Sequence, residues 1–153
     1  MKVTVYKVGK TRFSVLSTRE SQEVAGGLCA FVALHQGDTE IELRTIARSL
    51  LNLKIFFDKS DRNVNKSLLE VGRQLIIFIH ITVSAVVRDG EEPVFQSSLN
   101  YQQSREMFNR FKEILQLMYR PEMIKVGSLR HRSHFELMMN GPVAATLESY
   151  PPK

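Results

Sequence analysis

The sequence predicts an α+β fold, in which sheets that carry antiparallel strand pairs pack against two long helices. The expected elements follow the order strands, helix, strands, helix, strands, which is typical of this class. The chain has 153 residues, the length of one ordinary domain. Hydrophobic residues make up 43% of the chain and charged residues 24%, so the chain has enough apolar side chains for a globular core.

Three strands are expected in the first part of the chain. Hydrophobic and polar residues alternate over residues 3–8, and a β-rich segment follows at residues 11–16. Gly26 and Gly27 then interrupt the chain before an apolar run that ends at Leu34. A short apolar run bounded by glycines favours a buried strand.

Two segments carry apolar residues at helical spacing. The first begins after Asp38 or Thr39, either of which can cap free amides, and ends near Asn52. The second runs from about residue 102 to residue 119, where Pro121 is expected to stop it. We interpret the apolar stripe of each helix as core packing.

The other strands are short, with one exception. The apolar run of residues 75–87 is the strongest strand signal in the chain. Shorter strands are expected at residues 54–57, 124–126, 135–139 and 143–147. Loops are expected at residues 58–66 and 88–93, with a tight turn at Asn140-Gly141-Pro142.

The charge of the chain suits a phosphate-bearing partner, but only weakly. The net charge is +5 and the isoelectric point about 9.5. Neutralising phosphates releases counterions and so drives nucleic-acid binding. Many soluble proteins are equally basic without that role.

Cysteine content and apolar runs indicate the cellular compartment in which the protein is expected. Cys29 is the only cysteine, so no disulfide framework exists, and a buried core residue is the better interpretation than a catalytic thiolate. The first residues do not resemble a signal peptide. The run 75–87 is too short to span a bilayer. We therefore expect a cytoplasmic protein without membrane contact.

Three stretches of the sequence resemble the D-aminoacyl-tRNA deacylase family. The first reads Leu-Asn-Leu-Lys-Ile-Phe at residues 51–56, where the family has Leu-Asn-Leu-Arg-Ile/Val-Phe. The second is the apolar strand 75–83, followed by Gly90 and by Pro-Val-Phe at residues 93–95. The third begins with Tyr-Arg-Pro-Glu-Met-Ile-Lys at residues 119–125 and continues to residue 149. It is similar to the eukaryotic members in particular, and the resemblance covers nearly the whole chain.

The resemblance implies a single domain over residues 1–149, with a short tail at residues 150–153. It implies a homodimer of the D-Tyr-tRNA deacylase-like fold, which uses no cofactor. The implied reaction is hydrolysis of the ester between a D-amino acid and the terminal ribose of tRNA. The partner is then the aminoacylated 3′ end of tRNA.

Candidate catalytic residues lie in the run 79–83. His80 and Thr82 are two residues apart on the expected strand and so point to the same side, which can place a base beside a hydroxyl. No orienting carboxylate is identifiable, and a partly buried histidine beside a β-forming threonine is the plainer interpretation. The family motif Ser-Gln-Phe-Thr-Leu falls on this run and only Thr82 matches it. Backbone amides of Ile81 and Thr82 remain available as oxyanion donors.

A second candidate site is Gly141-Pro142. The resemblance implies that this pair is a rigid wedge, which reaches into the partner subunit's pocket and rejects L-amino acids by steric clash. An ordinary hairpin turn is the alternative, because Asn-Gly favours one. Met139 and Ala144 replace family residues that are polar, so the wedge has fewer polar anchors.

Arginines and histidines gather at residues 127–134. Arg130 and Arg132 are candidates for contact with tRNA phosphates, and a solvated charged loop is the alternative. The spacing of His131 and His134 is compatible with a metal site, but no further ligand types lie nearby, so no metal is expected.

Three functions follow from these observations. The first is an active D-aminoacyl-tRNA deacylase. The second is a relative with impaired catalysis that binds tRNA or DNA, as the altered run 79–81 and the added arginines suggest. The third is a deacylase of shifted specificity, for example for a small L-amino acid.

Overall fold

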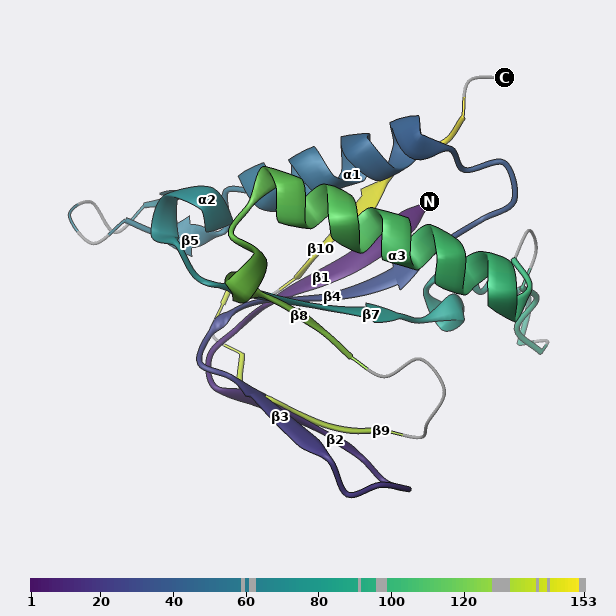
Figure 1. Cartoon of the computed structure of the whole chain (residues 1–153), viewed down its shortest axis with the longest axis horizontal. Coiled ribbons are helices and arrows are strands. Elements are labelled where there is room, and N and C mark those ends of the chain that lie inside the picture. The colour runs from purple at the N-terminus through teal and green to yellow at the C-terminus, as the bar shows by residue number, and fades with distance from the viewer. Residues whose placement is uncertain are drawn as a thin grey trace.

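The computed structural model describes residues 1–58, 60, 63–90, 92–95, 99–127, 133–139, 141–142 and 144–151. These residues form three layers, with two long helices above a five-stranded sheet and a three-stranded sheet below it (Figure 1). The expected α+β class is confirmed. No helix in these ranges has both the length and the apolar character that crossing a membrane requires.

The central sheet is mixed. Its strand order is β10-β1-β4-β7-β8. The strands are β1 (Lys2–Val8), β4 (Gly27–Ala33), β7 (Gln74–Ile79), β8 (Ile124–Val126) and β10 (Ala144–Glu148). β1 runs antiparallel to β10 and β4, whereas β7 runs parallel to β4 and β8. β4 and β7 are almost wholly buried, as expected for strands covered on both faces.

Helices α1 (Glu40–Asn52) and α3 (Tyr101–Met118) cover one face of this sheet (Figure 1). Thr39 caps α1 in a capping box with Glu42, and Asn100 caps α3 with Gln103. The apolar stripes of both helices are buried against the sheet in one core cluster. Both expected helices are therefore confirmed, with Thr39 rather than Asp38 as the first cap.

The opposite face of the sheet carries a second core. The three-stranded sheet consists of β3 (Ser21–Val24), β2 (Thr11–Val15) and β9 (Ser133–Leu137). Its aromatic rings pack edge-on or tilted against rings of the central sheet. Cys29 lies in this second core, where burial raises the pKa of its thiol to about 12. The expected buried, unreactive cysteine is thereby confirmed.

The remaining elements are short. They are β5 (Phe56–Phe57), β6 (Val64–Lys66), α2 (Leu68–Val71) and the 3₁₀-helices η1 (Ile81–Ser84) and η2 (Pro121–Met123). β6 lies inside the segment 58–66, which the sequence predicted as loop, and β3 was not predicted. Both strands are polar and exposed, so they lack the alternation by which a strand is recognised.

One expectation about the site-bearing segments is wrong, and one alternative is excluded. The strand expected over residues 75–87 ends at Ile79, and residues 81–84 form η1 instead. The segments on either side of Gly141-Pro142 do not form a hairpin, because β9 pairs with β2 and β10 pairs with β1. Gly141-Pro142 therefore lies on a crossover between two sheets.

Candidate active site

The first candidate site is a 3₁₀ turn at the carboxyl end of β7. The amide of His80 still donates to the carbonyl of Val32, 2.8 Å away. β4 ends at Ala33, so the chain beyond His80 has no neighbouring strand to pair with. Residues 81–84 turn back on themselves as η1 instead, in which the amide of Ala85 donates to the carbonyl of Thr82.

The start of η1 leaves two amides without a helical acceptor. The amide of Val83 is the first to reach back, and it donates to the carbonyl of His80 at 3.2 Å. The amides of Ile81 and Thr82 precede it and have no intrahelical partner. Both residues are exposed. They are thus two adjacent donors at the surface, of the kind that stabilises an oxyanion.

His80 and Thr82 are in direct contact. Nδ1 of His80 and Oγ1 of Thr82 form a hydrogen bond. The sequence left this contact open beside the plainer interpretation of a partly buried histidine; η1, and not a shared strand face, brings the two side chains together. The ring of His80 lies edge-on against Phe31, with centroids 5.5 Å apart. Burial lowers the pKa of His80 below its ordinary value of 6.5. The neutral imidazole can therefore accept a hydrogen bond from the Thr82 hydroxyl.

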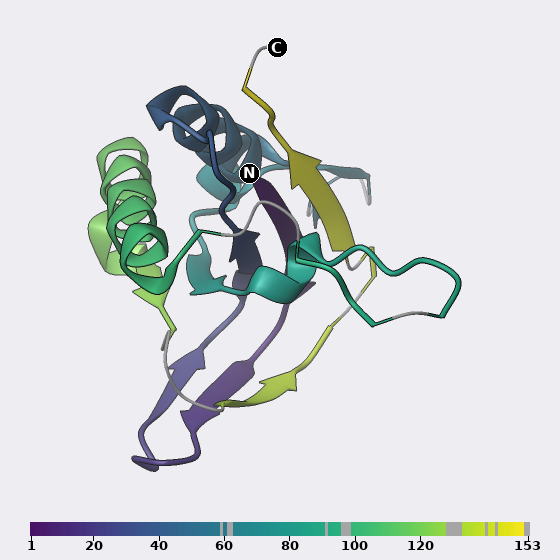
Figure 2. The same cartoon turned by 90° about the vertical axis from the view of Figure 1, so that its right-hand side faces the viewer.

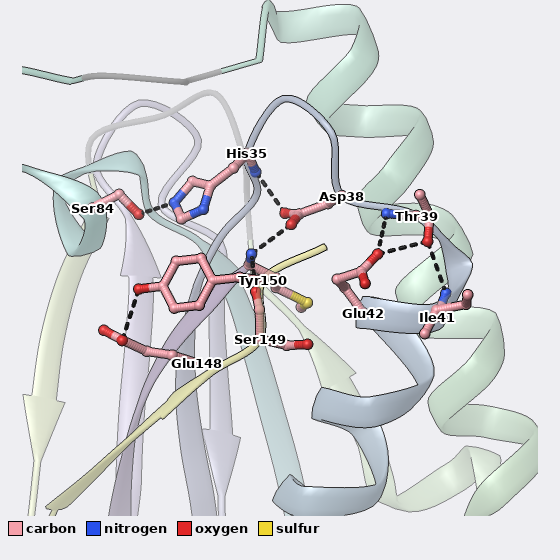
Figure 3. Close-up of polar contacts among 10 residues, drawn as sticks. His35, Asp38, Thr39, Ile41, Glu42, Ser84, Glu148, Ser149 and Tyr150 are labelled. Carbon is pink, nitrogen blue, oxygen red and sulfur yellow. Dashed lines mark hydrogen bonds and ion pairs between the residues drawn. The ribbon is translucent and has the colours of Figure 1, made fainter. Parts of the chain in front are cut away.

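A second histidine holds the other end of η1. Nε2 of His35 and Oγ of Ser84 form a hydrogen bond, and the amide of His35 donates to Asp38 at 2.7 Å. Asp38 also accepts from the buried amino group of Met1 at 2.6 Å. Figure 3 shows His35 joined to both Ser84 and Asp38. Hydrogen bonds from the buried amino group of Met1 through Asp38 and His35 therefore hold Ser84, the last residue of η1, in position.

The second candidate site is the crossover with Gly141-Pro142. The peptide bond between these residues is cis. The carbonyl of Gly141 accepts from Nζ of Lys7 at 3.0 Å, and the amide of Gly9 donates to the carbonyl of Met138 at 2.7 Å. Gly141 and Pro142 are exposed, and a Cβ added at Gly141 would meet no atom within 4 Å. The pair is therefore hydrogen-bonded to β1 on one side and exposed to solvent on the other.

The two sites lie at opposite ends of the central sheet. The amide of His80 donates to Val32, which pairs with Val3 of β1. Gly141, in contrast, accepts from Lys7 of the same strand. Four residues of β1 separate these levels, a length of roughly 13 Å. Figure 1 likewise shows β7 leading to η1 at one end of the molecule and the β9–β10 crossover toward the other. One chain does not bring its two sites together.

The basic cluster of residues 127–134 is described only at its edges. Arg130, Arg132 and His131 lie outside the described residues, so their expected roles stay predictions. His134 is exposed, with its Nε2 atom 3.9 Å from Glu136. Within the ranges that the structure describes, no three His, Cys, Asp or Glu side chains group as a metal site would require.

Some residues around the two sites were not predicted from sequence. His35 and Ser84 are 49 residues apart in the chain, and nothing local connects them. Lys7 did carry a signal, because it stands in the alternating face that Val3 and Val5 occupy, where an apolar residue is expected. Its side chain is buried in that face.

Comparisons with known proteins identify relatives of the chain. The family model described as D-Tyr-tRNA(Tyr) deacylase matches residues 4–148. D-aminoacyl-tRNA deacylase 1 of Homo sapiens is 32% identical over 153 residues, which span 99% of this chain and 72% of the human protein. D-aminoacyl-tRNA deacylase of Carboxydothermus hydrogenoformans is 31% identical over 97% of this chain and 99% of its own length.

Two solved structures share the fold. The structure titled c-Myc DNA Unwinding Element Binding Protein superposes with a TM-score of 0.91 at 29% identity, over 99% of this chain and 100% of its own. A structure titled as a probable eukaryotic D-amino acid tRNA deacylase superposes with a TM-score of 0.79 at 16% identity, over 95% and 97% of the two chains. The second likeness shows the fold alone.

Proposed function

Since the chain belongs to the D-Tyr-tRNA(Tyr) deacylase family, we propose that it hydrolyses the ester bond of D-aminoacyl-tRNA. The products are a free D-amino acid and a tRNA with an intact terminal ribose. This reaction removes wrongly charged tRNA from translation, and a cytoplasmic location belongs to the same proposal. The observation that carries it is the family match over almost the whole chain, together with the two exposed amides at the start of η1 that have no helical acceptor.

Hydrolysis of an aminoacyl ester does not require a nucleophilic side chain, because the ester is already activated. Water attacks the acyl carbon, the bond to the ribose oxygen breaks, and that oxygen takes up a proton. Negative charge develops on the carbonyl oxygen during the attack, where the amides of Ile81 and Thr82 can stabilise it. Neutral His80 holds the Thr82 hydroxyl at the edge of this site. The altered side chains of the family motif leave the amide donors in place.

We extend the proposal to a homodimer with composite sites. Gly141-Pro142 of one subunit would stand opposite η1 of its partner, since the two lie too far apart within one chain. The surface beside η1 supports this arrangement. Residues 85–90 project away from the sheets (Figure 2) and carry exposed Val86 and Val87; Val86 pairs with exposed Val94, and exposed Ile81 stands at the start of η1. Exposed apolar side chains in such a group are typical of an interface.

Nucleic-acid binding without turnover is the second candidate. The solved structure at 29% identity is titled as a DNA unwinding element binding protein, and three of the five residues aligned with the family's Ser-Gln-Phe-Thr-Leu motif differ in polarity or aromatic character. This candidate has less support, because the matched family and the curated relatives are described as deacylases.

Deacylation assays on purified protein separate these candidates. D-tyrosyl-tRNA and L-tyrosyl-tRNA are followed in parallel, with alanyl-tRNA and glycyl-tRNA as tests of shifted specificity. The proposal expects loss of the D-ester alone. If no ester is lost while tRNA or DNA still binds in a salt-dependent manner, the second candidate replaces the first.

A further inference from the structure

A cleft beside Gly141 carries cations that the proposed mechanism does not use. Its volume is about 710 Å³, within the range of sites that bind small ligands. Its charged lining residues are Lys7, Asp58, Lys66, Glu70 and Arg73, and the ring of Phe57 lies among them. We name it the Lys7–Arg73 cleft.

The acidic residues of this cleft already have partners. Glu70 is paired with Lys54 and lies 3.8 Å from Lys66. Asp58 lies 3.4 Å from Lys66 and accepts from Ser60. Within the described ranges, neither carboxylate reaches Lys7 or Arg73. These two cations therefore face the cleft without a counterion.

Lys7 has unused donor capacity in an unusual setting. Only 8% of the residue is exposed, and its Nζ atom lies 4.8 Å from the centroid of the Phe57 ring. One N–H binds the carbonyl of Gly141, which leaves two donors of the ammonium group. Burial and the nearby charge of Arg73 lower the pKa of Lys7 below its ordinary value. A bound anion would relieve both effects.

Arg73 is held in position by its backbone. Its carbonyl accepts from the Tyr119 hydroxyl at 2.8 Å, and the next amide, of Gln74, donates to Gly26 at 3.3 Å. The Nη1 atom lies 3.4 Å from the place that a Cβ on Gly26 would take. The guanidinium thus sits beside the end of β1 that carries Lys7, with planar donors suited to a phosphate.

We propose that the Lys7–Arg73 cleft binds a phosphate of a single-stranded RNA end. The exposed ring of Phe57, half accessible to solvent, adds a flat apolar surface of the kind on which bases stack. The identity of the strand as the tRNA 3′ end rests on the proposed function. Lys7 links the cleft to Gly141, which the homodimer would place beside the terminal ribose, and the last phosphodiester of the strand is attached to the 5′ carbon of that ribose.

Binding of an uncharged RNA tests the cleft without any turnover. A labelled single-stranded RNA ending in CCA is titrated with the protein at several salt concentrations, and fluorescence anisotropy gives the affinity. Arg73→Gln is expected to weaken binding about tenfold, the effect of one charge-assisted hydrogen bond. The slope of log K against log salt should become shallower by about 0.7. Arg73→Lys should retain most of the affinity.

Arg105→Gln is the matched control, because it removes the same charge from the exposed N-terminal part of α3, at the other end of the molecule (Figure 1). Its affinity and slope should equal those of the wild type. RNA affinity that is unchanged in Arg73→Gln would overturn the proposal. The proposal would also be overturned if inorganic phosphate bound at a site that depends on Arg73 and the RNA did not displace it.

These outcomes separate the cleft from the proposed function. A protein that binds the RNA through Arg73 but leaves D-tyrosyl-tRNA intact contradicts the deacylase function and keeps the subsite. A protein that hydrolyses the ester, with RNA binding indifferent to Arg73, contradicts the subsite alone.

Discussion

Under the proposed function, the side chain at position 80 differs from that of the family motif while the backbone donors of the site remain. The resemblance to the family places a glutamine at this position, and a neutral imidazole can take over its acceptor role. Burial keeps the imidazole neutral by lowering its pKa, and the contact with Thr82 uses that neutral form. The amide donors of Ile81 and Thr82 belong to the backbone, so they remain in place as long as the side chain at position 80 still accepts from Thr82 and so orders the start of η1.

The neutral form of His80 makes a prediction about pH. The rate of D-ester hydrolysis should fall as the pH drops through the lowered pKa of His80, since protonation removes the acceptor at Nδ1. His80→Gln should retain activity at neutral pH and lose this acid dependence. The pH profile of kcat/KM measures both, after subtraction of spontaneous hydrolysis. His134→Gln, an exposed histidine on β9, is the control, and a fall that persists in His80→Gln would contradict the assignment.

At the scale of elements, strands with regular alternation or continuous burial were predictable, because their pattern is local. The end of β7 was not, since it depends on where β4 ends 46 residues earlier in the chain. The composition of the residues after His80 suits a strand as well as it suits η1, so composition alone does not distinguish the two. The alternative of an ordinary hairpin at Gly141-Pro142 stayed open in the sequence, because strand pairing across sheets leaves no mark in local sequence. The contact between His80 and Thr82 was one of two interpretations of the sequence, whereas nothing in the sequence indicated the His35–Ser84 contact.

The anchor at the end of η1 should matter for catalysis more than for stability. Ser84→Ala removes the hydrogen bond to His35 and frees the turn that positions the amides. We expect kcat to fall about tenfold, with little change in the midpoint of thermal unfolding. Ser60→Ala, which removes a hydroxyl from an exposed loop hydrogen bond, should leave kcat unchanged. Equal rates in the two variants would show that His35 does not position η1.

The register between β4 and β7 depends on Gly27. Its φ is +150°, and an added Cβ would lie 1.8 Å from the carbonyl oxygen of Gln74. Because that oxygen is backbone, Gly27→Ala should lower the free energy of unfolding by roughly 2–4 kcal/mol. Urea denaturation measures the change. Gly9→Ala, whose Cβ would make only ordinary contacts from 3.6 Å, is the control and should be nearly neutral. A small effect at Gly27 would mean that the strands separate easily here.

At the scale of the whole molecule, the fold places its two candidate sites at opposite ends of one sheet. A composite site then needs two copies of the chain, related by a two-fold axis that brings η1 of each copy to the Gly141-Pro142 crossover of the other. The exposed apolar side chains beside η1 are the surface that such a partner would cover. The resemblance predicted a homodimer, and the separation of the sites supplies a physical reason for one.

Mixed dimers test the composite site. Thr82→Pro disrupts η1 by removing an amide donor, and Gly141→Ala alters the crossover, so each variant alone should be nearly inactive. Half of randomly mixed two-fold dimers would combine the variants and contain one intact site, which should restore about a quarter of the wild-type activity. The deacylation rate after mixing and re-equilibration measures this recovery. Its absence, with subunit exchange shown by mass spectrometry, would place both elements in the same chain's site.

The most direct test of the account is the single-turnover hydrolysis of D-tyrosyl-tRNA and L-tyrosyl-tRNA by the wild type and by Gly141→Ala. A Cβ at Gly141 would meet no atom of the described residues within 4 Å, so the variant should fold like the wild type. We predict fast loss of the D-ester alone in the wild type. In Gly141→Ala we predict a decrease of about 100-fold, since a small misplacement at a reacting centre has that effect. A wild type that leaves both esters intact would contradict the account.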